Sequence, residues 1–145
     1  MMIDTHCHIN DIKYNLDLKE VISRAVESGV EKMICVGTDL KTSEKAIELA
    51  DQYTEIYATV GYHPHESKDA QKGYLYELEE MGKNPKVVAI GESGLDYHYN
   101  ISPENIQKKI FKSSKIKIGV KFLIEMEFCL QVQLKTIHYL YNQKS

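Results

Sequence analysis

Two histidines near the start of the chain, His6 and His8, are the residues best suited to chemistry. They follow a short apolar run and are separated by Cys7. Alternate side chains of a β-strand share a face, so we expect both imidazoles to point one way and Cys7 the other. Two imidazoles projecting from a strand end form a clamp for a divalent cation. The alternative is that two histidines fall by chance near an exposed terminus.

Further polar residues follow later apolar runs. His63 and His65 come directly after the run 56–60, and Glu92 follows the run 86–90. The carboxyl ends of parallel strands lie on one rim of a sheet, so these side chains and the first two histidines are expected on the same side. Glu92 can bridge two cations or complete a histidine site, or it is a solvated loop acid. His63 and His65 contact substrate phosphate, lie beside the metal, or are surface histidines.

Four other residues have weaker indications. Asp4 shares the face of the first two histidines, and it either orients a ligand imidazole or pairs in the barrel floor. Asp96 either fixes the loop after Glu92 or touches substrate. Cys7 and Cys35 are expected to pack in the core.

The elements that position these residues alternate between strands and helices. Apolar runs predict strands at the N-terminus and over 30–36, 56–60 and 86–90. Helical spacing predicts helices over 17–28, after a cap at Asp39 or Thr42, over about 73–81, and after Ser102–Pro103. Alternating strands and helices are typical of an α/β fold with a parallel sheet and right-handed crossovers.

The composition narrows the class of protein. A chain of 145 residues fits one domain, and a net charge of −3 argues against a broad basic surface for nucleic acid. That charge does not exclude an enzyme that grips a phosphodiester through metal ions. The 10 tyrosines are scattered and do not indicate a base-stacking platform. The sequence shows no signal peptide, no membrane span and no disulfide framework, so we expect a cytoplasmic protein with no membrane partner.

The last third of the chain has a different pattern. Apolar residues alternate with Lys or Gly over 115–124, and alternate again over 125–135. Period two predicts strands with one solvated face, which we expect to add as an edge hairpin or to be disordered. We therefore divide the chain into residues 1–112 and a divergent tail, 113–145.

Three motifs together carry a family resemblance: Ile3-Asp4-Thr5-His6-Cys7-His8, Gly61-Tyr62-His63-Pro64-His65 and Ala89-Ile90-Gly91-Glu92-Ser93-Gly94-Leu95-Asp96-Tyr97. Over roughly residues 1–112 the chain resembles the TatD family of metal-dependent deoxyribonucleases. The resemblance implies a (β/α)8 TIM barrel with one or two divalent cations (Mg, Mn or Zn) that hydrolyses phosphodiester bonds in DNA.

Residue roles follow from the same resemblance. His6 and His8 match ligands of the first metal, Glu92 matches a carboxylate shared with a second metal, and His63 matches a family histidine near the site. We accordingly expect Glu92 and His63 to act in catalysis, and His65 and Asp96 to bind substrate.

The chain also departs from the family pattern. The family supplies further ligands from later strands, and the region where a fifth-strand histidine is due, residues 123–130, contains none. A full barrel takes about 250 residues, so we expect about four β/α units. Such an open sheet is expected to flatten and spread its ligands apart, and its exposed edge to favour self-association.

The change of pattern also suggests a frameshift after about residue 112. Two other functions stay open: a related amide or small-phosphoester hydrolase, and a non-catalytic fragment or binding module.

Overall fold

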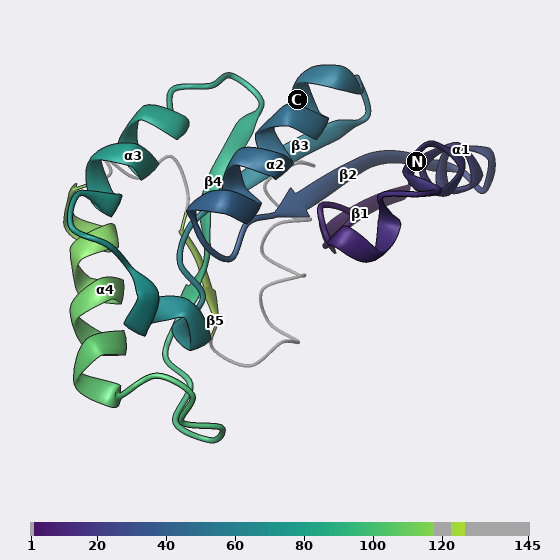
Figure 1. The fold of residues 1–145 in the computed structure, drawn as a ribbon. Helices are drawn as coiled ribbons and strands as arrows, with labels where there is room; N and C mark the ends of the chain where they lie inside the picture. The colour runs from purple at the N-terminus through teal and green to yellow at the C-terminus, as the bar shows by residue number, and fades with distance from the viewer. Residues whose placement is uncertain (1, 118–122, 127–145) are drawn as a thin grey trace.

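The computed structural model describes residues 2–117 and 123–126, in which strands and helices alternate along the chain (Figure 1). The elements in order are β1 (Met2–Cys7), the 3-10 turn η1 (Ile12–Tyr14), α1 (Leu18–Glu27), β2 (Val30–Val36), α2 (Leu40–Gln52), β3 (Ile56–Val60), the 3-10 turn η2 (Pro64–Asp69), α3 (Tyr74–Met81), β4 (Val87–Gly94), α4 (Glu104–Lys117) and β5 (Leu123–Met126). The expected strands and helices are confirmed as far as β4, which is longer than the run 86–90 suggested.

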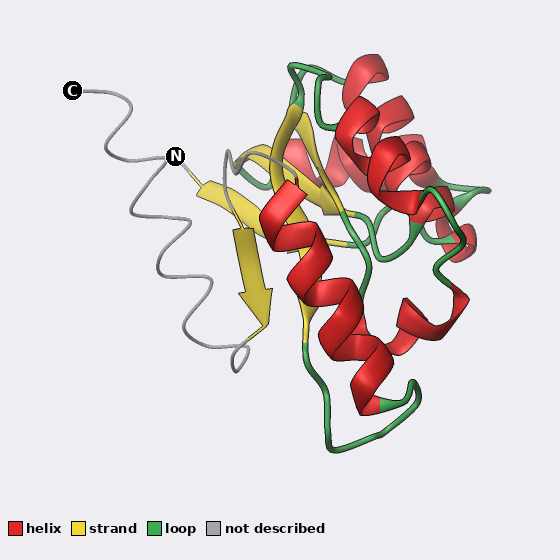
Figure 2. Ribbon diagram, turned by 90° about the vertical axis from the view of Figure 1, so that its left-hand side faces the viewer, coloured by secondary structure: helices red, strands yellow, loops and turns green. Residues whose placement is uncertain are grey.

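The strands form one sheet in the order β1-β2-β3-β4-β5, and every neighbouring pair is parallel. Figure 2 shows the helices gathered on one face of this curled sheet. This is the arrangement expected of successive β/α units of a TIM barrel, in which helices cover the outside of the strands.

The core lies between the sheet and its helices. Each of the four helices turns apolar side chains inward at helical spacing, and alternate residues of the strands meet them. Its buried members include Ile22, Leu49, Leu78 and Ile110 from the helices, and Met33, Cys35, Ile56, Ala58, Val60 and Val87 from the strands.

The strand prediction for the tail was wrong at residues 115–117 and is confirmed at residues 123–126. Residues 115–117 belong to α4, because lysine is a good helix former and an established helix extends at little cost. β5 pairs parallel to β4, because α4 provides the crossover that parallel pairing needs. The expected hairpin within the tail would need residues 127–135, which lie outside the described part, so it stays a prediction. β5 thus covers the edge of β4, where one of the two expectations for the tail placed an added edge element. Residues 118–122 and 127–145 lie outside the described part, and self-association stays a prediction.

The sheet is curled at its carboxyl end, where two close contacts join β2, β3 and β4. The backbone N–H of Glu92 donates to the carbonyl of Gly37 at 2.8 Å, which joins β4 to the end of β2 across β3. A Cβ on Gly61 would lie 2.8 Å from the backbone of Gly91, so β3 and β4 approach more closely here than a side chain would allow. The expected flattening of a partial barrel is therefore wrong for this end of the sheet.

The first turn of α2 lies beside this curled rim. The carboxylate of Asp39 accepts the N–H of Thr42 at 2.7 Å, and the Thr42 hydroxyl accepts the N–H of Asp39 at 2.9 Å. This reciprocal capping box satisfies two donors at the start of the helix. The predicted cap at Asp39 is confirmed.

None of the helices in the described ranges is both long and apolar enough to pass through a lipid bilayer.

Candidate metal centre

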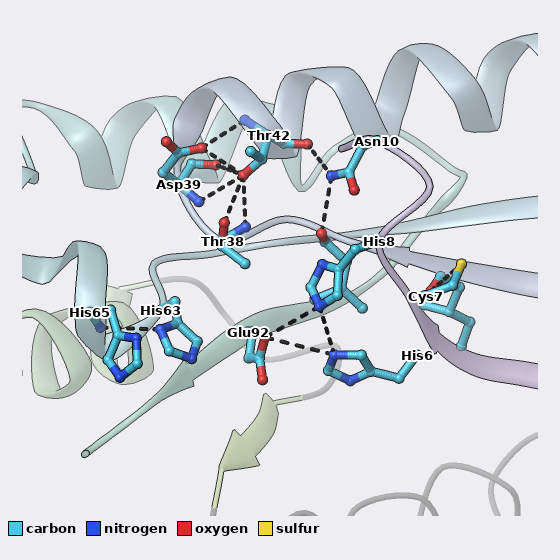
Figure 3. A network of polar contacts seen from close by, with 12 residues as sticks. His6, Cys7, His8, Asn10, Thr38, Asp39, Thr42, His63, His65 and Glu92 are labelled. Atoms are coloured by element: carbon cyan, nitrogen blue, oxygen red, sulfur yellow. Dashed lines mark hydrogen bonds and ion pairs between the residues drawn. The ribbon is translucent and has the colours of Figure 1, made fainter. Parts of the chain in front are cut away.

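Three side chains converge at the carboxyl end of the sheet: His6 at the end of β1, His8 directly after β1, and Glu92 in β4 (Figure 3). The Nε2 atoms of His6 and His8 lie 3.1 Å apart. An Oε2 atom of Glu92 lies 3.7 Å from Nε2 of His6 and 3.9 Å from Nε2 of His8. The two imidazoles do share a face, as strand alternation predicted, and the carboxylate reaches them from three strands away.

These separations fit one bound cation. Zinc bonds to imidazole nitrogen and to carboxylate oxygen measure about 2.0–2.2 Å, so two donors on the same ion lie no more than about 4.4 Å apart. All three separations, 3.1, 3.7 and 3.9 Å, are below that limit. Imidazole suits zinc and other transition metals, and carboxylate oxygen suits Mg²⁺ and Mn²⁺ as well. The donor set therefore fits a divalent cation without selecting one.

The loop that follows His8 is bonded to two other segments of the rim. The side-chain amide of Asn10 donates to the carbonyl of Val36 at 3.1 Å and to the carbonyl of Thr42 at 2.9 Å. These bonds join the loop to the end of β2 and to the first turn of α2 (Figure 3). Sequence reasoning missed Asn10, although an amide side chain two residues after a candidate ligand is a recognisable signal.

Asp4 bonds to the backbone rather than to a ring. Its Oδ1 atom accepts the backbone N–H of His6 at 3.1 Å, and its side chain is exposed. This contact steadies the strand next to the imidazole. A role in orienting a ligand ring stays a prediction.

Glu92 is the most enclosed member of the cluster, only 8% exposed. Burial raises the pKa of its carboxyl, while the nearby His8 and His65 act in the opposite direction. Burial also lowers the pKa of His6. A cation between these groups would favour the carboxylate and the neutral imidazole, which are the forms that bind metal.

His63 lies between His65 and Glu92 in Figure 3. Its Nδ1 atom accepts the backbone N–H of His65 at 3.1 Å, so the proton of the neutral ring is on Nε2. Burial, followed by the neighbouring His65, lowers the pKa of His63 to about 4. His63 is therefore a neutral hydrogen-bond donor at pH 7, which suits an anionic oxygen.

His65 and Asp96 form a side-chain pair, with Nε2 of the imidazole against Oδ2 of the carboxylate. The bond to His65 lowers the pKa of Asp96. The other oxygen of Asp96 accepts the backbone N–H groups of His98 at 2.8 Å and Tyr99 at 3.2 Å. Asp96 thus fixes the loop after β4, one of its two expected roles, and its contact with substrate stays a prediction.

Sequence reasoning also missed Gln107, a fully buried residue of α4. Its Oε1 accepts the backbone N–H of Asp96 at 2.7 Å, and its Nε2 donates to the carbonyls of Asp96 at 2.9 Å and Ser102 at 2.7 Å. The usable signal is its place on the buried face of the helix, three residues before Ile110. The hydroxyl of Ser102, just before α4, donates to the carbonyl of His65 at 2.6 Å, which joins the loop to η2.

The two cysteines in the described part of the chain, Cys7 and Cys35, lie outside the cluster. The thiol of Cys7 turns away from the imidazoles and donates to the carbonyl of Ile34 at 3.4 Å, and Cys35 is fully buried. Both pack against the helical layer, as their strand positions predicted.

Comparison with known proteins places this geometry in a family. The family profile described as TatD related DNase matches residues 3–121, which extends past the motif-bearing segment 1–112. An uncharacterized metal-dependent hydrolase, YabD, of Bacillus subtilis is 44% identical over 113 residues, which cover 78% of this chain and 44% of that protein. The 3'-5' ssDNA/RNA exonuclease TatD of Escherichia coli K12 is 34% identical over 110 residues, 76% of this chain and 42% of that protein.

Solved structures agree with the sequence comparison. A TatD family hydrolase of Entamoeba histolytica superposes with a TM-score of 0.73 and 30% identity, over 79% of this chain and 44% of that one. A TatD homologue of Escherichia coli K12 gives a TM-score of 0.71 and 30% identity, over 78% and 44%. The chain spans less than half the length of the relatives it matches. With the family profile matched over most of its residues, the chain belongs to the TatD family of metal-dependent hydrolases.

Proposed function

We propose that the cluster of His6, His8 and Glu92 is the metal-binding part of a site that hydrolyses phosphodiester bonds in DNA. The observation that carries the proposal is the convergence of two imidazole nitrogens and one enclosed carboxylate within 4.8 Å of one another. Relatives named as 3'-5' ssDNA/RNA exonucleases support a nucleic acid as the substrate.

Each residue has a distinct task in this proposal. His6, His8 and Glu92 would hold one or two divalent cations, which polarise the phosphate and lower the pKa of a bound water. His63 donates from Nε2 to a phosphate oxygen, since its Nδ1 is occupied by the backbone of η2. His65 is held in position by Asp96 beside the same rim, where it can contact the next phosphate.

The proposal concerns the site to which these β/α units contribute. Because the chain matches 42–44% of the length of its curated relatives, activity of this chain by itself is a separate question. Metal binding by the three convergent donors does not depend on the answer. The experiments therefore measure binding and hydrolysis separately.

The first experiment titrates Zn²⁺, Mn²⁺ and Mg²⁺ into the purified chain by calorimetry. We expect the wild type to bind metal, and His6→Ala, His8→Ala and Glu92→Gln to bind it much more weakly. Loss of an outer hydrogen-bond partner typically lowers metal affinity by about 10- to 100-fold, so loss of a ligand should lower the affinity by more than that. His98→Ala is the matched control, because this histidine is exposed and lies outside the cluster. Equal binding by wild type and the three cluster variants would remove the metal centre.

The second experiment follows a labelled single-stranded oligodeoxynucleotide with and without the bound metal. We expect metal-dependent cleavage that Glu92→Gln abolishes and Glu48→Gln, an exposed glutamate of α2, leaves intact. If metal binds but only a small phosphoester or an amide is hydrolysed, the substrate assignment is wrong. If metal binds and none of these substrates is hydrolysed, this chain is a binding fragment.

A further inference from the structure

The loop between β4 and α4 exposes large aromatic side chains. It projects past the start of α4 in Figure 2. Tyr97 is 48% exposed and Tyr99 is 68% exposed, and the intervening His98 is exposed as well. Exposed aromatic rings gathered on one short segment are typical of a binding surface, because each leaves apolar area in water.

The backbone of this loop is nevertheless firmly held. Asp96 accepts the N–H groups of His98 and Tyr99, and Gln107 bonds to the N–H and the carbonyl of Asp96. Ser102, fully buried at the far end of the loop, donates to His65 and accepts the N–H of Lys68 at 3.1 Å. The exposed rings therefore stand on a fixed support, which reduces the entropy that a ligand must overcome on binding.

The rings lie beside the metal centre. The ring centroid of Tyr99 is 5.8 Å from that of His65, which is 4.4 Å from that of His63. Figure 3 shows His63 between His65 and Glu92, the carboxylate of the cluster. A continuous row of side chains thus leads from the cluster out to Tyr99.

The ring of Tyr99 meets its two histidine neighbours in edge-to-face arrangements. Its planes with His65 and with His98 are nearly perpendicular, at 84° and 83°. Among the described residues no ring lies parallel to that of Tyr99. The ammonium of Lys108 is 5.2 Å from the ring centroid of Tyr97, so a positive charge accompanies the aromatic groups.

We propose that Tyr99, together with Tyr97, is a nucleobase-stacking site that holds single-stranded nucleic acid next to the metal centre. This inference rests on the proposed function and adds how the substrate is bound. A base of a single strand offers a free face to an aromatic ring, whereas a duplex keeps its bases stacked internally, and the positive charge suits the adjoining phosphate. The tyrosines as a whole are scattered in the sequence, but these two share one loop, which the fold places at the rim.

The test measures binding of fluorescein-labelled dT10 by anisotropy, in EDTA so that no metal contributes. Stacking on one aromatic side chain corresponds to a loss of about 5- to 150-fold in affinity when the ring is removed. We expect Tyr99→Ala to weaken binding by at least about fivefold and Tyr99→Phe to retain it. Tyr76→Ala is the matched control, because Tyr76 is 67% exposed but lies on α3.

Competitors separate bases from phosphates and single strands from duplexes. We expect unlabelled dT10 to displace the probe, and an abasic oligomer of the same length or a blunt duplex to compete poorly. Equal affinity of wild type and Tyr99→Ala, or an equal loss in Tyr76→Ala, would overturn the site. So would equal competition by the abasic oligomer, or no binding by the wild type up to about 1 mM, above the usual range for non-specific contacts.

The outcome is independent of hydrolysis. Base stacking without cleavage would leave the stacking site in place and show that this chain binds nucleic acid but does not hydrolyse it alone. Metal-dependent cleavage that Tyr99→Ala does not affect, together with unchanged dT10 affinity, would refute the stacking site alone. Circular dichroism of each variant shows whether a loss of binding reflects unfolding.

Discussion

Replacing Gln107 with leucine removes the residue that fixes the loop after β4. The change keeps the approximate volume of the side chain but deletes its three hydrogen bonds, to the N–H and carbonyl of Asp96 and to the carbonyl of Ser102. Three bonds at about 1 kcal/mol each give an expected loss of about 3 kcal/mol, and more if these backbone groups stay buried without partners. Domains of this kind have unfolding free energies of about 5–15 kcal/mol, so the effect is large.

Urea unfolding followed by circular dichroism measures this loss directly. With an m-value of about 1–3 kcal/mol per molar, the midpoint should fall by about 1–3 M. Gln52→Leu, at an exposed position in α2, is the control and should change stability little. Gln107→Glu keeps one acceptor but turns a carboxylate toward two carbonyl oxygens, so its penalty at pH 7 should shrink as the pH falls and the acid is protonated. A loss in Gln107→Leu no larger than that in Gln52→Leu refutes the anchoring role.

Three further predictions concern the rim of the sheet. Gly37→Ala would place a Cβ 2.3 Å from Oγ and 2.7 Å from Cα of Ser43, so we expect the free energy of unfolding in urea to fall by about 1–3 kcal/mol. Adding Ser43→Ala should not fully restore the stability, because the overlap with the backbone of residue 43 remains. His63 has a folded pKa of about 4 against 6.5 in the unfolded chain, so below pH 6.5 the unfolded state binds the proton first. Stability in EDTA should therefore fall between pH 6.5 and 4, by at most about 3 kcal/mol, and less so in His63→Asn; identical pH profiles of the two proteins would contradict this assignment. Asp39→Ala removes the side-chain acceptor of the Thr42 N–H and should cost about 0.5–2 kcal/mol in thermal melts, whereas Asp39→Ser should retain most of the stability.

The order of strands and helices could be predicted because its causes are local. Helical spacing in α1 and α2, the capping residue Asp39, and the continuous apolar runs of β2 and β3 each depend on neighbours within a few residues. The placement of His6 and His8 on one face follows from the period of a strand. The same reasoning failed at residues 115–117, where an apolar–lysine alternation is compatible with a strand or with the end of a helix.

The finer parts of the site depend on contacts between distant segments. Asn10 reaches carbonyls 26 and 32 residues away, and Gln107 reaches a loop 11 residues earlier. The backbone groups that these two side chains bind have no recognisable sequence pattern, because any backbone carbonyl can accept a hydrogen bond. The closeness of His6 and Glu92 similarly requires the curvature of three intervening strand pairs. The family resemblance predicted a curved sheet, whereas physical reasoning about an isolated half barrel predicted that the sheet would flatten.

The hydrogen bond from the Glu92 amide to Gly37 has a consequence for how the site is assembled. Its two groups are far apart in the chain and lie on strands that are not neighbours, so it can form only after β3 has paired with both β2 and β4. The amide proton of Glu92 is therefore a natural reporter of sheet assembly in hydrogen-exchange measurements, protected only in molecules that have completed this part of the fold. A cation binding at His6, His8 and Glu92 would favour these molecules over partly opened ones. Metal affinity and the completion of this part of the fold are therefore thermodynamically linked.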